Sequence, residues 1–243
     1  GSRAPVLEFK QLGWVVKVFH VLNDNRRVAS FSNKIGECVN AVYAAKLSVG
    51  PSVHGVVARV LRAEGAENQP ALKLQLLLCM QVGAQHKYFL STPGQAQRPA
   101  AAESLRVLLE RASHFMLLSD LKGPNVVWVQ RSGGFRARLI DLDPNVTLLF
   151  NQQLSYACAV VFNCVMLLTF SVREERSPGR PPALVVDEDV RQLYGPVAQL
   201  LRRTLRGYDW QDACLKLKSA TGVPTRNPHE RRSQQYWFHT MFY

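Results

Sequence analysis

The 243-residue sequence has little of what several classes of protein require. Its five cysteines include no Cys-x-x-Cys pair and no Cys/His cluster, which argues against a zinc site and a disulfide framework. It has no RNA-binding signature and no single basic helix face, so we do not expect a nucleic-acid partner. Acidic residues are few, 18 against 30 basic ones, and the net charge of +12 favours phosphates and other acidic partners.

Long hydrophobic runs are also scarce. Only residues 154–172 are nearly all apolar, and their length approaches that of a membrane span. A helix that is apolar on all sides is either such a span or the buried centre of a large lobe. Asn163 lies at its centre, with Ser and Thr around it. We favour the buried core helix and do not expect an integral membrane protein.

Residues 117–144, LLSDLKGPNVVWVQRSGGFRARLIDLDP, carry the most informative chemistry. Asp120 is suited to orient a hydroxyl group and accept its proton, and Lys122 to neutralise charge on a moving phosphoryl group. Asn125 and Asp141 supply hard oxygen ligands of the kind that Mg²⁺ prefers. The alternative is that Asp120 and Asn125 only form a surface turn, because Asp, Asn, Gly and Pro are common in turns.

Two short strands are expected between these candidate ligands, at residues 126–130 and 135–140, joined through a Ser-Gly-Gly turn. They would form a hairpin that brings Asn125 and Asp141 together.

A second group of candidate residues lies near the N-terminus. Residues 12–21 are typical of a strand and contain one lysine, Lys17. Glu37 follows twenty residues later, which we interpret as the start of an Ala-rich helix that reaches residue 47. A solvated lysine and a surface glutamate are the simpler interpretation of each residue alone. Their order relative to Asp120, Asn125 and Asp141 favours a joint role.

Taken in order, Val15-Val16-Lys17, Glu37, Asp120-Leu121-Lys122-x-x-Asn125 and Asp141 resemble the functional residues of protein kinases. The resemblance implies that Lys17 holds the phosphates of ATP and that Glu37 orients Lys17. It further implies that Asp120 is the base, that Lys122 steadies the γ-phosphate, and that Asn125 and Asp141 bind Mg²⁺.

The match departs from ordinary kinases at several positions. Leu118 and Ser119 stand where His and Arg are usual, Asp141-Leu142-Asp143 replaces D-F-G, and no A-P-E motif follows. We therefore expect no long activation loop that is regulated by phosphorylation.

The resemblance implies an α+β, bilobal kinase-like fold with residues 1–83 as the N-lobe and residues 84–243 as the C-lobe. We expect strands at 56–61 and 72–80, helices at 100–115, 190–205 and 210–217, and an aromatic tail at 225–243 docked on the larger lobe. The resemblance places the hinge at Gln81-Val82-Gly83, which would hold the adenine by backbone hydrogen bonds. Met80, Gln81 and Val82 are the candidate residues for binding it.

The region before Lys17 lacks what kinases use to cover the phosphates. Only sixteen residues precede it, with Gly13 as the one glycine after Gly1, so we expect a reduced N-lobe without a glycine-rich loop. In this the chain resembles the With-No-Gly-loop kinases of Toxoplasma and related parasites, relatives of the rhoptry kinases. That resemblance implies an ATP- and Mg²⁺-dependent Ser/Thr protein kinase, secreted into the parasitophorous vacuole, acting on protein substrates near membranes. We also expect a monomer and weak nucleotide affinity.

Two other functions stay open at this point. One is a pseudokinase, a catalytically inactive kinase fold that serves as a binding or scaffold module. The other is a small-molecule phosphotransferase, which the Asp-Leu-Asp triplet and the missing peptide platform suggest.

Overall fold

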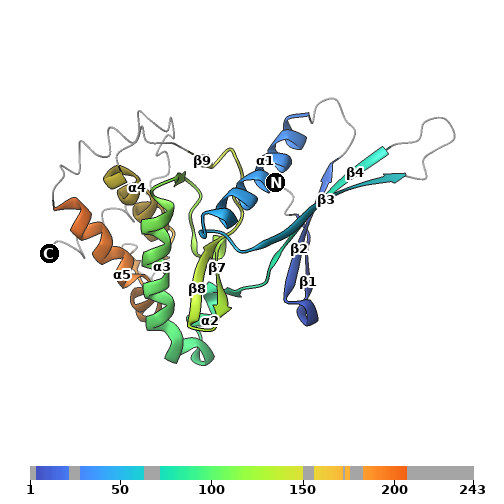
Figure 1. Cartoon of the computed structure of the whole chain (residues 1–243). Coiled ribbons are helices and arrows are strands. Elements are labelled where there is room, and N and C mark those ends of the chain that lie inside the picture. Colours follow the sequence, from blue (N-terminus) through green and yellow to red (C-terminus); the bar gives the residue numbers. More distant parts are fainter. Residues whose placement is uncertain are drawn as a thin grey trace. The chain divides into compact units, whose positions relative to one another are not determined.

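The computed structural model has an α+β fold (Figure 1), which confirms the coarse fold class. It describes residues 4–21, 28–62, 72–149, 156–171, 173–175 and 183–206. The predicted helix at 210–217 and the aromatic tail at 225–243 lie outside these residues. The chain divides into two compact units: Gly1–Gly83 with Arg138–Asn145, and Ala84–Ala137 with Val146–Tyr243. Their assignment to the two lobes of a kinase stays a prediction.

The first unit contains a four-stranded antiparallel sheet and one long helix (Figure 1). The spatial order of the strands is β1-β2-β4-β3, so the strand that follows the helix in sequence lies at an edge. The elements in chain order are β1 (Val6–Phe9), β2 (Trp14–Val21), α1 (Val28–Lys46), β3 (Val53–Arg62) and β4 (Leu72–Gln81).

The period-2 alternation of β2 and β4 decides which side chains form the core of this unit. In β4 alternate residues are buried, Leu76, Leu78 and Met80, and they pack with Phe19 of β2 and Cys38 of α1. Residues directly opposite each other in an antiparallel pair point to the same face. Lys17 lies opposite Leu78, so its side chain leaves β2 on the face that α1 covers.

Helix α1 begins earlier than the sequence indicated. The expectation that Glu37 stands at the head of the helix was wrong, since α1 starts at Val28 and Glu37 lies in its middle. Ser and Asn residues in the first half have low intrinsic helix propensity and hid the start. Packing of the helix against the sheet, through Cys38 and Ala41, overrides that local preference.

A tight hairpin places β1 beside the strand that carries Lys17. The 3-10 turn Lys10–Leu12 is followed by Gly13, whose φ of 65° lies in the left-handed region that glycine enters without steric cost. β1 then pairs with β2 so that Val6 lies opposite Lys17.

The second unit is mainly helical. Its long helices are α3 (Arg98–Ala112), α4 (Tyr156–Thr169) and α5 (Glu188–Leu205), with the short α2 (His86–Phe89). Its strands are β5 (Ala84–Gln85), β6 (Met116–Leu118), β7 (Val126–Arg131), β8 (Gly134–Leu139), β9 (Thr147–Leu149), β10 (Arg173–Glu175) and β11 (Ala183–Val185). β5, β7 and β8 form one sheet in that order, and β6 pairs with β9. Arg138 and Leu139, the last residues of β8, group with the first unit.

The apolar stretch predicted as a core helix forms α4. Most of its side chains are buried, including Val160, Cys164 and Leu167, each fully buried. Within the described ranges, no helix combines the length and the hydrophobicity needed to cross a membrane.

Candidate functional site

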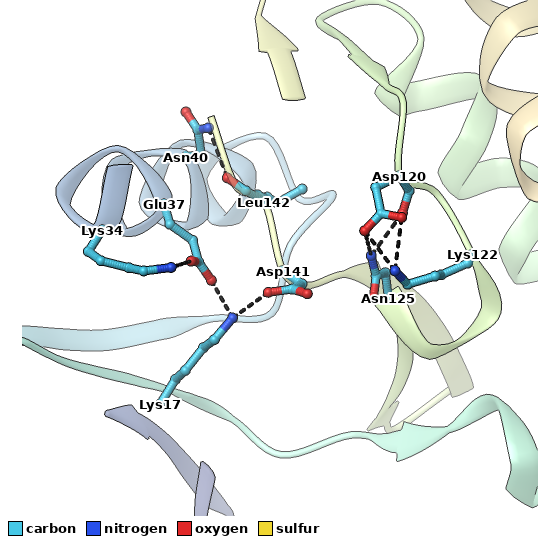
Figure 2. Close-up of polar contacts among 9 residues, drawn as sticks. All are labelled: Lys17, Lys34, Glu37, Asn40, Asp120, Lys122, Asn125, Asp141 and Leu142. Atoms are coloured by element: carbon cyan, nitrogen blue, oxygen red, sulfur yellow. Dashed lines mark hydrogen bonds and ion pairs between the residues drawn. The ribbon is translucent and has the colours of Figure 1, made fainter. Parts of the chain in front are cut away.

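The first group of candidate residues meets at Lys17. Its ammonium donates hydrogen bonds to Glu37 Oε1 and to Asp141 Oδ1 (Figure 2), and all three residues belong to the first unit. They come from β2, from the middle of α1 and from the segment after β8. The Glu37 side chain is only 4% exposed, whereas that of Asp141 is 46% exposed. Lys17 thus joins a buried carboxylate to one that solvent can reach.

Burial and charge act in opposite directions on this cluster. Burial acts to lower the pKa of Lys17, but Glu37 and Asp141 together raise it above its usual value, so the ammonium stays charged at neutral pH. Burial raises the pKa of the Glu37 carboxyl, although Lys17 acts against this rise. The cluster therefore depends on keeping opposite charges in contact.

The segment around Asp141 is held against α1. Asn40 Nδ2 donates to the Leu142 carbonyl oxygen at 3.0 Å. Gly36 allows the close approach, because a Cβ there would lie 2.8 Å from Cγ of Pro144. Asp141 itself has φ of 61°, a left-handed conformation that costs a residue with a Cβ about 1 kcal/mol and that Asp tolerates better than most. Helix α1 therefore both carries Glu37 and fixes the segment that presents Asp141.

Asp143 does not share this arrangement. Its carboxylate accepts hydrogen bonds from the backbone N–H and side-chain Nδ2 of Asn145, both at 2.8 Å. Asp143 is thus part of a local turn, which distinguishes it from the lysine-bound Asp141.

The second group of candidate residues meets at Asp120, in the second unit (Figure 2). Lys122 Nζ donates to both carboxylate oxygens, at 2.8 and 2.7 Å. Asn125 Nδ2 donates to the backbone oxygen of Asp120 at 2.8 Å, so Oδ1 is the atom that Asn125 would offer to a cation. Asp120 and Lys122 are each about one-third exposed, while Asn125 is buried.

A buried amide holds the strand that leads into Asp120. Asn163 of α4 is fully buried; its Oδ1 accepts from the Leu118 N–H and its Nδ2 donates to the Met116 carbonyl, both at 3.0 Å. Nδ2 also donates to Ser113 Oγ at 3.0 Å. From the sequence, Asn163 was noted only as a polar residue at the centre of the apolar stretch, and this role was missed. The available signal was a lone amide within an otherwise apolar helix.

Leu118 and Ser119, the two residues before Asp120, have structural roles. Leu118 is buried. Ser119 donates from its N–H and its Oγ to the Val146 carbonyl, at 2.9 and 3.1 Å. Both therefore fix the backbone just before Asp120.

The close packing of the loop after Asp120 also requires glycine at position 123, which was not singled out from the sequence. A Cβ at this position would lie 2.7 Å from Tyr194 Oη and 2.8 Å from His86 Cδ2. Burial lowers the pKa of His86, so its ring is neutral at pH 7. At position 123, only glycine fits without moving Tyr194 and His86.

The predicted hinge has its amides engaged within the first unit. The Gln81 N–H donates to the Ser52 carbonyl and the Val82 N–H to the Gly13 carbonyl, both at 2.9 Å. The Met80 side chain is buried in the core, on the face that carries Lys17. Nucleotide binding through these two N–H groups would require them to leave their present acceptors.

The oxygen ligands that Asp141 and Asn125 offer suit Mg²⁺, but the two residues belong to different units. A carboxylate oxygen of Asp141 and the amide oxygen of Asn125 are both hard ligands, and Mg²⁺ usually completes its shell with water and substrate phosphates. Among the described residues, no group of three or more His, Cys, Asp or Glu side chains forms a metal cluster.

No protein-family model matches the chain, and no curated protein matches it either. The structure brings together Lys17, Glu37 and Asp141 in one unit, and Asp120, Lys122 and Asn125 in the other.

Proposed function

We propose that the protein is an ATP- and Mg²⁺-dependent kinase that transfers the γ-phosphoryl group to Ser or Thr hydroxyls of proteins. The fold would be a bilobal kinase-like one with a reduced N-lobe that has no glycine-rich loop. One observation carries the proposal: the Lys17 ammonium lies between the buried Glu37 and the exposed Asp141. A lysine oriented by a buried carboxylate, beside a second carboxylate that can turn to a metal, is suited to bind phosphates.

The arrangement of the first unit supports the same function. The lysine strand is followed by the glutamate helix and two more strands, in the spatial order β2-β4-β3. In protein kinases the corresponding lysine lies on a strand and pairs with a glutamate of helix αC.

Each residue then has a defined task. Lys17, oriented by Glu37, would bind the phosphates, while Asp120 would orient the acceptor hydroxyl and accept its proton. Lys122, in contact with Asp120, would neutralise charge on the moving group. Mg²⁺ bound by Asn125 and Asp141 would supply charge neutralisation at the phosphates. Phosphoryl transfer depends mostly on such positioning and charge stabilisation.

The resemblance to With-No-Gly-loop kinases extends the proposal to the setting of the reaction. We propose a secreted, monomeric enzyme of the parasitophorous vacuole that acts on protein substrates near membranes. The exposed Asp141 and the engaged hinge amides are in line with weak nucleotide affinity.

The test compares the wild type with Asp141→Ala and with Asp143→Ala as the matched control. Asp143 lies two residues away, but its carboxylate bonds to Asn145 and not to Lys17. We expect Mg²⁺–ATP to raise the melting temperature of the wild type and of Asp143→Ala, and labelled phosphate to reach an acceptor protein. Asp141→Ala should lose both effects. A wild type that shows neither a shift nor transfer would rule out the proposal.

A second candidate is a pseudokinase that binds partners without phosphoryl transfer. The observation in its favour is that the Gln81 and Val82 amides already have acceptors within the first unit. This candidate predicts no transfer to proteins or to small amino-alcohols at any ATP concentration. Transfer to amino-alcohols alone would instead identify a small-molecule phosphotransferase.

A further inference from the structure

A second ammonium group shares the carboxylate that orients Lys17. Lys34 lies one turn before Glu37 in α1, and its Nζ is 3.7 Å from Glu37 Oε2, while Lys17 binds Oε1 (Figure 2). The Nζ atoms of Lys17 and Lys34 each lie 5.4 Å from the centroid of the Phe19 ring. The two ammonium groups therefore each lie beside one oxygen of the buried Glu37 carboxylate, and both lie near the Phe19 ring.

This arrangement differs from an ordinary charge pair on a helix surface. Such exposed pairs contribute little because water and salt screen them. Here the shared carboxylate is 4% exposed, and the side chains of Lys17 and Lys34 are 14% and 30% exposed. Charges in such surroundings act on each other and on a bound ligand more strongly than they would in bulk water.

The charges of the cluster balance only while Asp141 takes part. Counted over these four described side chains alone, two ammonium groups face two carboxylates, Glu37 and Asp141, and their charges sum to zero. If Asp141 turns to a metal ion, Lys17, Lys34 and Glu37 are left with one positive charge in excess. Without Lys34 the remaining pair would be neutral, and the phosphates would meet one positive charge fewer.

We propose that Lys34 supplies the excess positive charge that holds the nucleotide phosphates at Lys17. Lys34 acts through Glu37 and is therefore a positioning residue. By drawing on one oxygen of Glu37, it leaves Lys17 less neutralised and more attractive to a phosphate. This inference rests on the proposed function, because it assumes that Lys17 binds a nucleotide.

The experiment measures binding of ATP and of adenosine, both with Mg²⁺, to four proteins by calorimetry. They are the wild type, Lys34→Met, Lys34→Arg and Lys46→Met. Lys46, the last residue of α1, is an exposed lysine of the same helix and serves as the matched control. Adenosine has no phosphates, so it reports any change in the site that is not electrostatic.

We expect Lys34→Met to weaken ATP binding roughly five- to tenfold at low ionic strength and to leave adenosine binding unchanged. Lys34→Arg should keep the affinity for ATP, and Lys46→Met should change neither ligand. The difference between Lys34→Met and wild type should shrink as salt is added. If Lys34→Met does not fold, Lys34→Gln replaces it and the same ratio of affinities decides.

Other results would overturn the inference in distinguishable ways. Equal ATP affinity of wild type and Lys34→Met would refute it and leave the proposed function standing. An equal loss for ATP and adenosine would mean that Lys34 only supports the local structure. A wild type that binds no ATP would remove the proposed function, and this inference with it.

Discussion

Lys17 and Glu37, twenty residues apart in the chain, form an ion pair between β2 and the middle of α1. Within the described residues, Lys17→Met would leave the buried Glu37 carboxylate with the more distant Lys34 as its partner. We expect the free energy of unfolding to fall by about 3 kcal/mol, the lower end of the cost of breaking a buried ion pair. Urea denaturation monitored by circular dichroism measures this change.

The control for this prediction is the double variant Lys17→Met, Glu37→Gln. It removes both charges, so it should recover most of the lost stability although it restores neither residue. A double variant that is as unstable as the sum of the two single variants would show that the charges do not interact.

A pair of substitutions in α4 tests how the Asp120 strand is held. Asn163→Leu removes the bonds to Ser113, Met116 and Leu118, and we expect a loss of about 2–4 kcal/mol. Thr169→Val is the matched control in the same helix. In the described part of the chain, Thr169 Oγ1 is a buried atom without a hydrogen-bond partner, so Val should be neutral or stabilising by about 1 kcal/mol. Thermal denaturation compares the two, and equal losses would contradict the assigned role of Asn163.

Gly123 should tolerate no side chain, whereas Gly133 should. Gly123→Ala places a methyl group against Tyr194 and His86, and we expect a cost of about 1–3 kcal/mol together with reduced phosphate transfer. Gly133→Ala, in the turn between β7 and β8, meets only the end of Arg136 at 3.9 Å and should change stability by less than about 0.5 kcal/mol. Denaturation and transfer assays on both variants check this. Full transfer activity in Gly123→Ala would show that the loop does not need its present position.

Local patterns predicted the fold class and several of the longer elements. The α+β class is confirmed, and the strands expected at 56–61 and 72–80 lie within β3 and β4. The lysine and glutamate were chosen by residue type and order, and the structure has them in contact. That they bind phosphates stays a prediction.

The features that sequence reasoning missed depend on partners far away in the chain. Asn163 bonds to groups 45 to 50 residues before it, and the Val82 amide to the carbonyl of Gly13, so neither leaves a local pattern. The start of α1 was missed because packing on the sheet outweighs the weak helix propensity of Ser and Asn. Lys34 was missed because its significance depends on the burial of Glu37.

Cys38 should resist alkylation until the protein unfolds. Burial, together with the neighbouring Glu37, raises the pKa of its thiol to about 11, and the side chain packs in the core beside Phe19. Because the thiolate is the reactive form, iodoacetamide at pH 8 should modify Cys38 far more slowly than the partly exposed Cys79.

A raised pKa of the Cys38 thiol in the folded state also means that stability from this group is present below about pH 9 and is lost as the pH rises toward 11. Mass spectrometry of alkylated peptides, with and without urea, measures the rates, and Cys38→Ala should remove this part of the alkaline loss of stability. Equal labelling of Cys38 and Cys79 in the folded protein would contradict the buried position of the thiol next to Glu37.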